Sequence, residues 1–237
     1  MNRFRYLPIG LALILLAGCS TTLRTSDSFQ QERTAIDRVA VMPPQISYTK
    51  RTATVYEPDP DTELIVNTVM LEALSNALAG TRVSVAPLLL TDSLLASDQD
   101  LALGLTRARE SFGDAADELA RTKAKVLTVS VDPEVGQFAD RADTDYLLFV
   151  RGMSYGSSGG AAAKDVAVAA ATMLLFGGMA YRQQKGIQIE LALVNANTAE
   201  VVWYNRNKPS ETNYNPLDVA SVQKLCAKLL KPLMPNT

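Results

Sequence analysis

The sequence predicts a single α/β sandwich domain over residues 38–237, in which helices pack on a mixed β-sheet. Short apolar runs typical of strands alternate with longer segments whose apolar residues recur every three to four positions, as in amphipathic helices. A hairpin pattern at 188–204 then precedes a closing helix, so part of the sheet is expected to be antiparallel. This order of elements is typical of one sheet covered by helices.

The first half of the domain is expected to alternate strands and helices. An apolar strand at 38–42 stops at Pro43 and Pro44, which cannot donate hydrogen bonds to a ladder. A polar loop at 48–61 precedes a helix that is capped by Asp61 or Thr62, runs to about Ala79 and ends at Gly80. Its apolar stripe comprises Val66, Val69, Met70, Ala73, Leu74, Ala77 and Leu78. A strand at 82–90 and a helical segment at 97–123, broken at Gly113, follow.

The second half begins with a strand at 126–131 and a short helix from Asp132-Pro133-Glu134 to about Ala142. Residues 145–153 form a continuous apolar run, which predicts a central strand. The hairpin turns at 195–198, and the final helix is expected to start at an Asn215 cap. The buried stripe of that helix comprises Val222, Leu225, Cys226, Leu229 and Leu233, with Cys226 acting as a small core residue rather than a reactive thiol.

The amino-terminal residues predict where the protein is held. Arg3 and Arg5 precede an apolar stretch, Leu7 to Leu16, that is too short to span a bilayer as a mature helix. The following Leu16-Ala17-Gly18-Cys19 resembles the bacterial lipobox, although a buried helix with an incidental cysteine is the alternative. The resemblance implies cleavage of residues 1–18 between Gly18 and Cys19, and diacylglycerol and an N-acyl chain on Cys19. Several acyl chains make membrane anchoring effectively permanent.

Two further expectations concern the anchor. In bacterial lipoproteins, Asp directly after the acylated cysteine is the usual signal for retention in the inner membrane, and this chain has Ser20 there. The resemblance therefore implies a location on the periplasmic side of the outer membrane. Residues 19–37 are polar and lack an apolar period, which predicts a lipidated tether. Such a coil is about 20–25 Å long on average. The domain is therefore expected to stay close to the membrane.

Composition excludes several classes of function. Residues 19–237 carry 21 basic and 25 acidic side chains, a net charge of −4, which disfavours nucleic-acid binding. The chain has no histidine, and Cys226 is the one cysteine besides Cys19, so His-based catalysis and His or Cys metal sites are excluded. No cofactor, metal or small-molecule substrate is expected beyond the acyl groups. Carboxylate chemistry stays possible, as does a Ser-Lys pair formed by Ser130 or Ser154 with Lys123 or Lys164.

Two local patterns permit a ligand site, but each is better explained by ordinary structure. Glu57, Asp59, Asp61 and Glu63 alternate, yet they lack the glycine and distal Glu of an EF-hand loop, so a solvated loop with a helix cap is expected. The glycine-rich stretch 156–160 lacks the Gly-Lys-Ser/Thr of a phosphate-binding loop and is interpreted as a turn.

An apolar Ala/Gly-rich insertion spans about 159–182. From Val166 to Tyr181 every residue is apolar or small except Thr172, and the stretch is short for a membrane span. Three alternatives stay open: a segment buried in this domain, a partner or self-association surface, and membrane insertion. The candidate residues for that surface are Val166, Ala170, Leu174, Phe176, Gly177, Gly178 and, from the hairpin, Trp203. Trp203 and Tyr204 are expected to face opposite ways, one into the core and the other outward as an anchor.

Three segments resemble the fold shared by the TolB amino-terminal domain, the curli secretion lipoprotein CsgG and the synthase activator LpoB. They are Val39–Pro44, Thr144–Val150 and Leu193–Trp203, where Ala199 replaces the usual glycine of the turn. The resemblance implies a non-enzymatic accessory or assembly factor of the envelope that binds a protein partner, possible homo-oligomers included. The alternative is a CsgG-like membrane-inserting secretion component, although the insertion lacks the alternation of pore hairpins. A periplasmic carboxylate or Ser-Lys hydrolase is a distant alternative.

Overall fold

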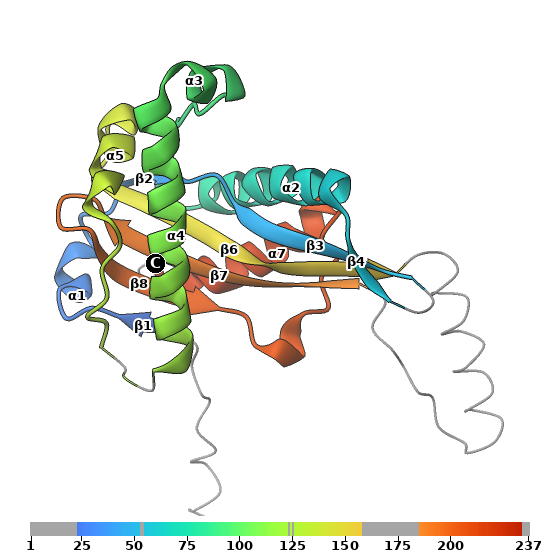
Figure 1. Ribbon diagram of the computed structural model, residues 1–237. Coiled ribbons are helices and arrows are strands. Elements are labelled where there is room, and N and C mark those ends of the chain that lie inside the picture. Colours follow the sequence, from blue (N-terminus) through green and yellow to red (C-terminus); the bar gives the residue numbers. More distant parts are fainter. Residues whose placement is uncertain (1–22, 53–54, 123, 125, 158–184, 234–237) are drawn as a thin grey trace, which may run out of the picture.

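The protein folds around one eight-stranded mixed sheet (Figure 1). This computed structural model describes residues 23–52, 55–122, 124, 126–157 and 185–233. The strands run in the order β1-β8-β7-β6-β2-β5, and β3 pairs with both β6 and β4. They are β1 Arg24–Thr25, β2 Arg38–Val41, β3 Gln45–Arg51, β4 Tyr56–Pro58, β5 Ser84–Ala86, β6 Tyr146–Ser157, β7 Lys185–Asn195 and β8 Glu200–Arg206. The predicted α/β class with helices on a mixed sheet is confirmed.

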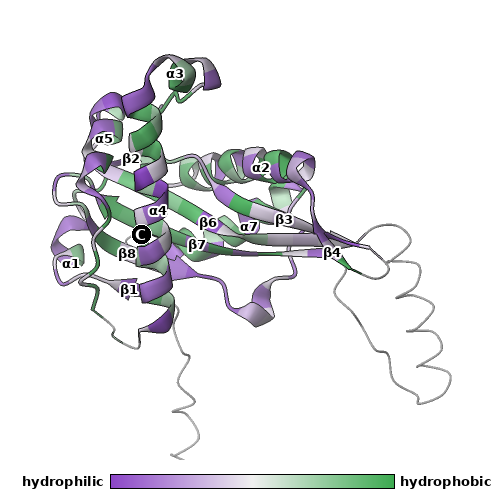
Figure 2. Cartoon of the chain, viewed as in Figure 1, coloured by the Kyte–Doolittle hydropathy of each residue, from purple (hydrophilic) through white to green (hydrophobic). Residues whose placement is uncertain are grey.

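Helices lie on both faces of this sheet. The α-helices are α1 Phe29–Glu32, α2 Pro60–Ala79, α3 Asp92–Ser97, α4 Gln99–Arg121, α5 Gly136–Ala142 and α7 Val219–Leu230, and short 3-10 turns are η2 Pro133–Val135, η3 Pro209–Glu211 and η4 Lys231–Leu233. One core cluster joins α2 and α7 to one face, and a second joins α4 and α5 to the other. Figure 2 shows hydrophobic residues on β6 and β7 where they pass behind α4.

The predicted central strand is confirmed as β6. It pairs antiparallel with β7 along its whole length and parallel with β2 and then β3 on its other side. Because both faces of its first half are covered, Leu147, Leu148, Phe149 and Val150 are buried without alternation. The hairpin of β7 and β8 is also confirmed, and Ala199 in its turn has a φ of 57°, in the left-handed region that favours glycine.

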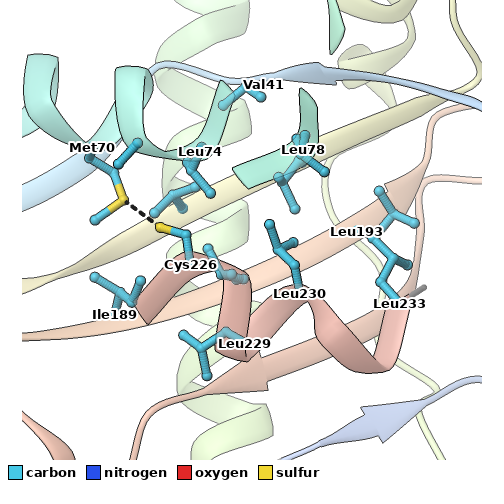
Figure 3. Packing of buried hydrophobic residues seen from close by; sticks show 14 of the residues in the cluster. Val41, Met70, Leu74, Leu78, Ile189, Leu193, Cys226, Leu229, Leu230 and Leu233 are labelled. Atoms are coloured by element: carbon cyan, nitrogen blue, oxygen red, sulfur yellow. Dashed lines mark hydrogen bonds between the residues drawn. The ribbon is translucent and has the colours of Figure 1, made fainter. Parts of the chain in front are cut away.

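The α2–α7 side holds the predicted stripes of both helices (Figure 3). Met70, Leu74 and Leu78 of α2 are fully buried against Cys226 and Leu229 of α7. The thiol of Cys226 lies 3.7 Å from the Met70 sulfur. Burial raises the pKa of the Cys226 thiol to about 12. The prediction that Cys226 is a core residue is confirmed.

The interpretation of residues 23–37 as a coiled tether is wrong. Arg24 and Thr25 pair with Tyr204 and Trp203, and α1 follows at once. Phe29 and Ile36 each expose 1% of their surface. Two buried apolar side chains and one strand pairing order an otherwise polar segment, so the folded domain includes the residues from Arg24 onward.

The predicted loop at 48–61 is wrong over most of its length, because β3 continues to Arg51, β4 spans Tyr56–Pro58 and α2 begins at Pro60. The chain leaves β2 at Pro43-Pro44 and rejoins β6 as β3, which forms a hairpin with β4. Pro43 and Pro44 therefore separate β2 from β3, and both strands pair with the same side of β6. Ile46 and Tyr48 alternate with exposed residues, the pattern of a half-buried strand.

Several predicted boundaries are corrected. Helix α4 continues through Gly113, and α2 is capped by Asp59, whose side chain accepts from the Thr62 amide. Helix α7 starts at Val219 with Asp218, not Asn215, as its cap. The predicted strand at 82–90 shrinks to β5, and 126–131 forms only isolated bridges in the part that the structure describes. The helix predicted after Asp132 is confirmed as η2 and α5.

Two predictions fall outside the described residues. The lipobox with Gly18 and Cys19 precedes Leu23, and the apolar insertion at 159–182 lies between β6 and β7. Within the described ranges, no helix is both long and apolar enough to cross a membrane.

Candidate functional site

One edge of the sheet is covered by the chain itself, and the opposite edge is short. The edge beyond β8 is covered by β1 and by the stretch 129–131, whose backbone exchanges hydrogen bonds with Ala199 and Val201. The opposite edge strand, β5, is only three residues long. Short or covered edges give a partner strand little to pair with.

The edge of β3 is closed by side chains of α2. Asn67 accepts from the Ile46 amide at 2.9 Å and donates to the Ile46 carbonyl at 3.2 Å, so it satisfies both backbone groups. Glu63 accepts from the Tyr48 amide at 3.2 Å. The amide of Asn67 thereby takes the place of a neighbouring strand, and strand addition at Ile46 is blocked.

One face of the sheet is left open beyond α4. Helix α4 crosses the first half of β6 and the end of β7, while no helix of the described chain covers the far half of the same face (Figure 1). Ser47, Met153 and Gln188 face that side, in one cross-strand row. Met153 exposes 61% of its surface although β6 is central to the sheet. A large apolar side chain exposed on a central strand marks a surface available for contact.

A row of polar side chains forms the boundary between the covered and open halves. The register places Gln45, Arg151, Glu190 and Arg206 side by side on β3, β6, β7 and β8. Arg151 donates to the Glu190 carboxylate at 2.8 Å and to the Gly113 carbonyl of α4 at 2.8 Å, and it also binds Asp117. Arg206 lies 3.7 Å from the other oxygen of Glu190. Arg151 thus ties α4 to the sheet.

The contacts of Arg151 shift its own pKa and that of Asp117. Burial alone would lower the pKa of Arg151, but the hydrogen bonds that it donates to Asp117 and Glu190 outweigh burial and raise the value. The hydrogen bond from Arg151 holds the pKa of Asp117 below its usual value. Burial, followed by the Glu190 carboxylate, raises the pKa of Tyr204 beneath the row. Asp117 therefore stays ionised at neutral pH, and Tyr204 stays protonated.

Two adjoining cavities open beside the row. The smaller, of about 400 Å³, is lined by Gln45, Arg109, Gly113, Asp117, Arg151, Gly152, Met153, Gln188 and Glu190. The larger, of about 950 Å³, is a groove between α2 and the stretch 85–95, and it shares Gln45, Arg109 and Gly152 with the first. Arg109 thus stands where the two meet. Ligand sites are commonly cavities of about 300–1,000 Å³, so both have a suitable size.

The predicted surface residue Trp203 is not available to a partner. Trp203 is fully buried and Tyr204 exposes 1% of its surface, so the expectation that one of them faces outward is wrong. The reason is that helices cover both faces of the sheet at β8. The other surface candidates, Val166, Ala170, Leu174, Phe176, Gly177 and Gly178, lie outside the described residues.

The other predicted sites have structural roles where they are described. Asp59 caps α2 and Glu63 binds the backbone of β3, as a loop with a helix cap requires. Within the described chain, no group of three acidic or thiol side chains is placed to hold a metal ion. Ser154 is buried and donates to the Ser47 carbonyl at 3.1 Å, while Lys123 and Lys164 lie outside the described residues.

Sequence reasoning missed the polar row and Arg109. A signal for the row exists, since Arg151 interrupts an apolar strand and Glu190 is a polar position of an alternating one. The pairing register that brings them together is set by the fold. Arg109 carries no such signal, because exposed arginines are ordinary on an amphipathic helix.

Comparisons with known proteins give only distant likenesses. No protein-family model and no curated protein matches the chain. The PelC dodecamer from Paraburkholderia phytofirmans is 15% identical, over 84% of this chain and 89% of that chain, with a TM-score of 0.33. Lipoprotein GNA1162 from Neisseria meningitidis is 13% identical, over 72% and 78%, with a TM-score of 0.30. The LpoB C-terminal domain from Salmonella enterica is 13% identical, over 73% and 81%, with a TM-score of 0.25.

Proposed function

We propose that the protein is a lipoprotein held on the periplasmic side of the outer membrane by acyl groups on Cys19, and that its domain is a non-enzymatic accessory factor of envelope assembly. The observation that carries this proposal is the stretch Leu16-Ala17-Gly18-Cys19, followed within a few residues by a folded domain that includes the residues from Arg24 onward. Acylation at Cys19 would place that domain directly at the membrane surface.

The arrangement of the polar row supports a role without catalysis. Asp117 and Glu190 both bind Arg151, and this contact lowers the pKa of Asp117, whereas a general acid at neutral pH requires a raised pKa. The thiol of Cys226 is buried, and its raised pKa keeps it protonated. The hydroxyl of Ser154 is engaged with a backbone carbonyl. None of these groups has the environment of a nucleophile.

The open half of the sheet is the surface that we assign to partner contact. Met153, Gln188 and Ser47 lie on paired strands and form a rigid platform. Methionine adapts its shape to a facing surface, and the amide and hydroxyl beside it can donate and accept hydrogen bonds. Because the sheet edges are covered, closed by side chains or short, this face is the more accessible surface for a protein partner.

Metabolic labelling with an alkyne analogue of palmitate tests the anchor. We expect the natural chain to be labelled and to sediment with outer membranes, and Cys19→Ser to lose both properties. Cys226→Ser is the matched control, because it removes the other cysteine from a buried position, and it should stay labelled. Labelling that persists in Cys19→Ser would refute the lipid anchor.

Site-specific photo-crosslinking in cells tests the contact surface. A benzophenone amino acid at Met153 should give a discrete adduct, whereas the same group at Glu72, exposed on α2, should not. An adduct with a second copy of this chain, accompanied by detergent-stable rings, would favour the secretion component over the accessory factor. Equal adducts at both positions, or none at Met153, would contradict the assignment of this face.

A further inference from the structure

We infer that the cavity at Arg109 binds the carboxylate of a small amphiphile, whose apolar chain lies in the adjoining groove. This ligand site does not depend on the lipid anchor, and it shares Met153, Gln188 and Ser47 with the partner surface. Arg109 lines both cavities, at the point where they join. A ligand headed by a carboxylate could therefore reach the guanidinium from the smaller cavity and extend its chain into the larger one.

Arg109 differs from the other arginine of the cavity in having no counterion. Arg151 is bound by Glu190, by Asp117 and by the Gly113 carbonyl. Arg109 makes no ion pair or hydrogen bond within the described part of the chain, and its Nε is buried without a partner. Burial lowers the pKa of Arg109. A half-buried cation without a partner is costly to the free protein, and a bound anion would offset that cost.

The surroundings of Arg109 favour a carboxylate over a phosphate. Asp117 and Glu190 line the same small cavity and would repel a dianion more strongly than a monoanion. Gln45 and Gln188 also line it, and their side-chain amides form no hydrogen bond with other described groups. A planar carboxylate can accept two bonds from a guanidinium and a further bond from an amide.

The larger groove has a mixed lining with an aliphatic part that an alkyl chain could cover. Several of its polar residues are engaged, Asn67 and Glu63 with the β3 backbone and Thr68 and Ser75 with carbonyls of α2, whereas Gln45 and Asp92 keep side-chain groups that a ligand could reach. The aliphatic part of the wall includes Val41, Leu64, Leu71, Val85, Leu88, Leu90, Leu95 and Leu105. An extended peptide would leave backbone groups without partners along this aliphatic part, whereas an alkyl chain has none to satisfy. The polar atoms of the ligand therefore belong at the Arg109 end.

Isothermal titration calorimetry with octanoate tests the site, using the full chain in lipid nanodiscs and empty nanodiscs as the blank. We expect octanoate to bind, and octanol and octylamine to bind more weakly. Affinity should rise from butanoate to octanoate by about fourfold for each added methylene that is buried. Arg109→Gln should weaken octanoate binding by about tenfold or more, because a charge-assisted bond is lost.

Arg107→Gln is the matched control. It removes the same charge from the same helix, but Arg107 faces solvent and pairs with Glu134. We expect its octanoate affinity to equal that of the natural chain. Thermal unfolding separates binding from folding: Arg109→Gln should melt at the same or a higher temperature, since an uncompensated cation is removed.

Four results would overturn the inference, of which three concern binding and the last concerns stability. The first is the absence of octanoate binding, and the second is an equal loss in Arg107→Gln and Arg109→Gln. The third is tighter binding of an apolar pentapeptide with a free carboxyl terminus, which would identify a peptide site instead of an amphiphile site. A lower melting temperature in Arg109→Gln with unchanged octanoate affinity would show that Arg109 is structural.

Discussion

Arg151→Met should destabilise the domain strongly, because it removes the cation that joins α4 to the sheet. The side chain of Arg151 is 23% exposed and that of Glu190 is 11% exposed. After the change, Arg206, at 3.7 Å, is the cation that still faces Glu190, and the Gly113 carbonyl loses the Arg151 donor. Methionine fills a similar volume, so the effect reports the lost bonds and not a cavity.

The magnitude follows from which of the three contacts are buried. Breaking a buried ion pair by removing one partner costs about 3–5 kcal/mol, and Arg206 compensates in part, so we expect about 3 kcal/mol. The contact with Asp117 adds little, because Asp117 is about half exposed and solvent screens it. For a domain of this size, a loss of that order lowers the melting temperature by about 6–12 °C.

Urea unfolding followed by circular dichroism measures this loss. Arg121→Met is the control, since Arg121 also binds Asp117, at 3.6 Å, but is 82% exposed. It should cost less than about 0.5 kcal/mol. In Arg151→Met with Glu190→Gln, part of the stability should return, because no buried carboxylate is left unpaired. A loss below about 1 kcal/mol in Arg151→Met would refute the view that this pair holds α4 in place.

Three further predictions follow from single contacts. Asn67→Ala leaves the amide and carbonyl of Ile46 without their partners and should cost about 1–3 kcal/mol in urea unfolding, with a tendency to associate through the freed edge of β3. Arg151 holds the pKa of Asp117 below its unfolded value, so the stability from this contact is present above about pH 4 and is lost as the pH falls through the folded pKa. When melting temperatures are measured over a pH series, Asp117→Asn should reduce the fall of the melting temperature at acid pH. Thiol titration at pH 8 should find no reactive cysteine in the native protein, since burial raises the pKa of Cys226 to about 12, and one per chain in denaturant if Cys19 is acylated, whereas two would contradict acylation.

The elements that the sequence predicted well are those with long, unbroken patterns. The stripe from Val66 to Leu78 repeats over four turns, and the apolar run of β6 has no competing interpretation. Hydrophobic burial determines both, so the residues themselves carry the information. For the same reason Cys226, in register with its neighbours on α7, was correctly predicted to be buried.

The errors arose where distant contacts decide the local structure. The segment from Arg24 to Ile36 is mostly polar, and its order comes from pairing with β8 and from two buried side chains. The strand β3 resembles a loop because its polar residues face solvent and Asn67 closes its edge from another element. Asn215-Pro216 resembles a helix start, yet Asp218 accepts the bond that begins α7. Local pattern cannot reveal a partner that lies far along the chain.

The candidate site was less accessible to prediction than the fold. Arg151 and Glu190 are 39 positions apart, and only the register of β6 and β7 makes them neighbours. The open half of the sheet exists because α4 covers one half, a fact about helix placement that no single residue encodes. Arg109 is distinguished from other arginines only by the structure, in which it has no ion pair with a described carboxylate and its Nε is buried without a partner.

Because Arg24 is already part of the sheet, the sheet sets how far each strand can lie from Cys19. Four residues lie between Cys19 and Arg24, so five Cα-to-Cα steps join them, with a reach of at most about 18 Å. Arg24 pairs with Tyr204, which the sheet aligns with Ala192 and Phe149, and from there β6 extends eight residues, or about 26 Å, to Ser157. Three strand spacings of about 4.8 Å also separate β1 from β6, so Ser157 lies about 30 Å from Arg24. With Cys19 acylated, the far end of β6 is therefore confined to about 48 Å from the anchor point. A partner engaged there must itself lie within that radius, and residues inserted after Ser20 would lengthen it by a known amount each.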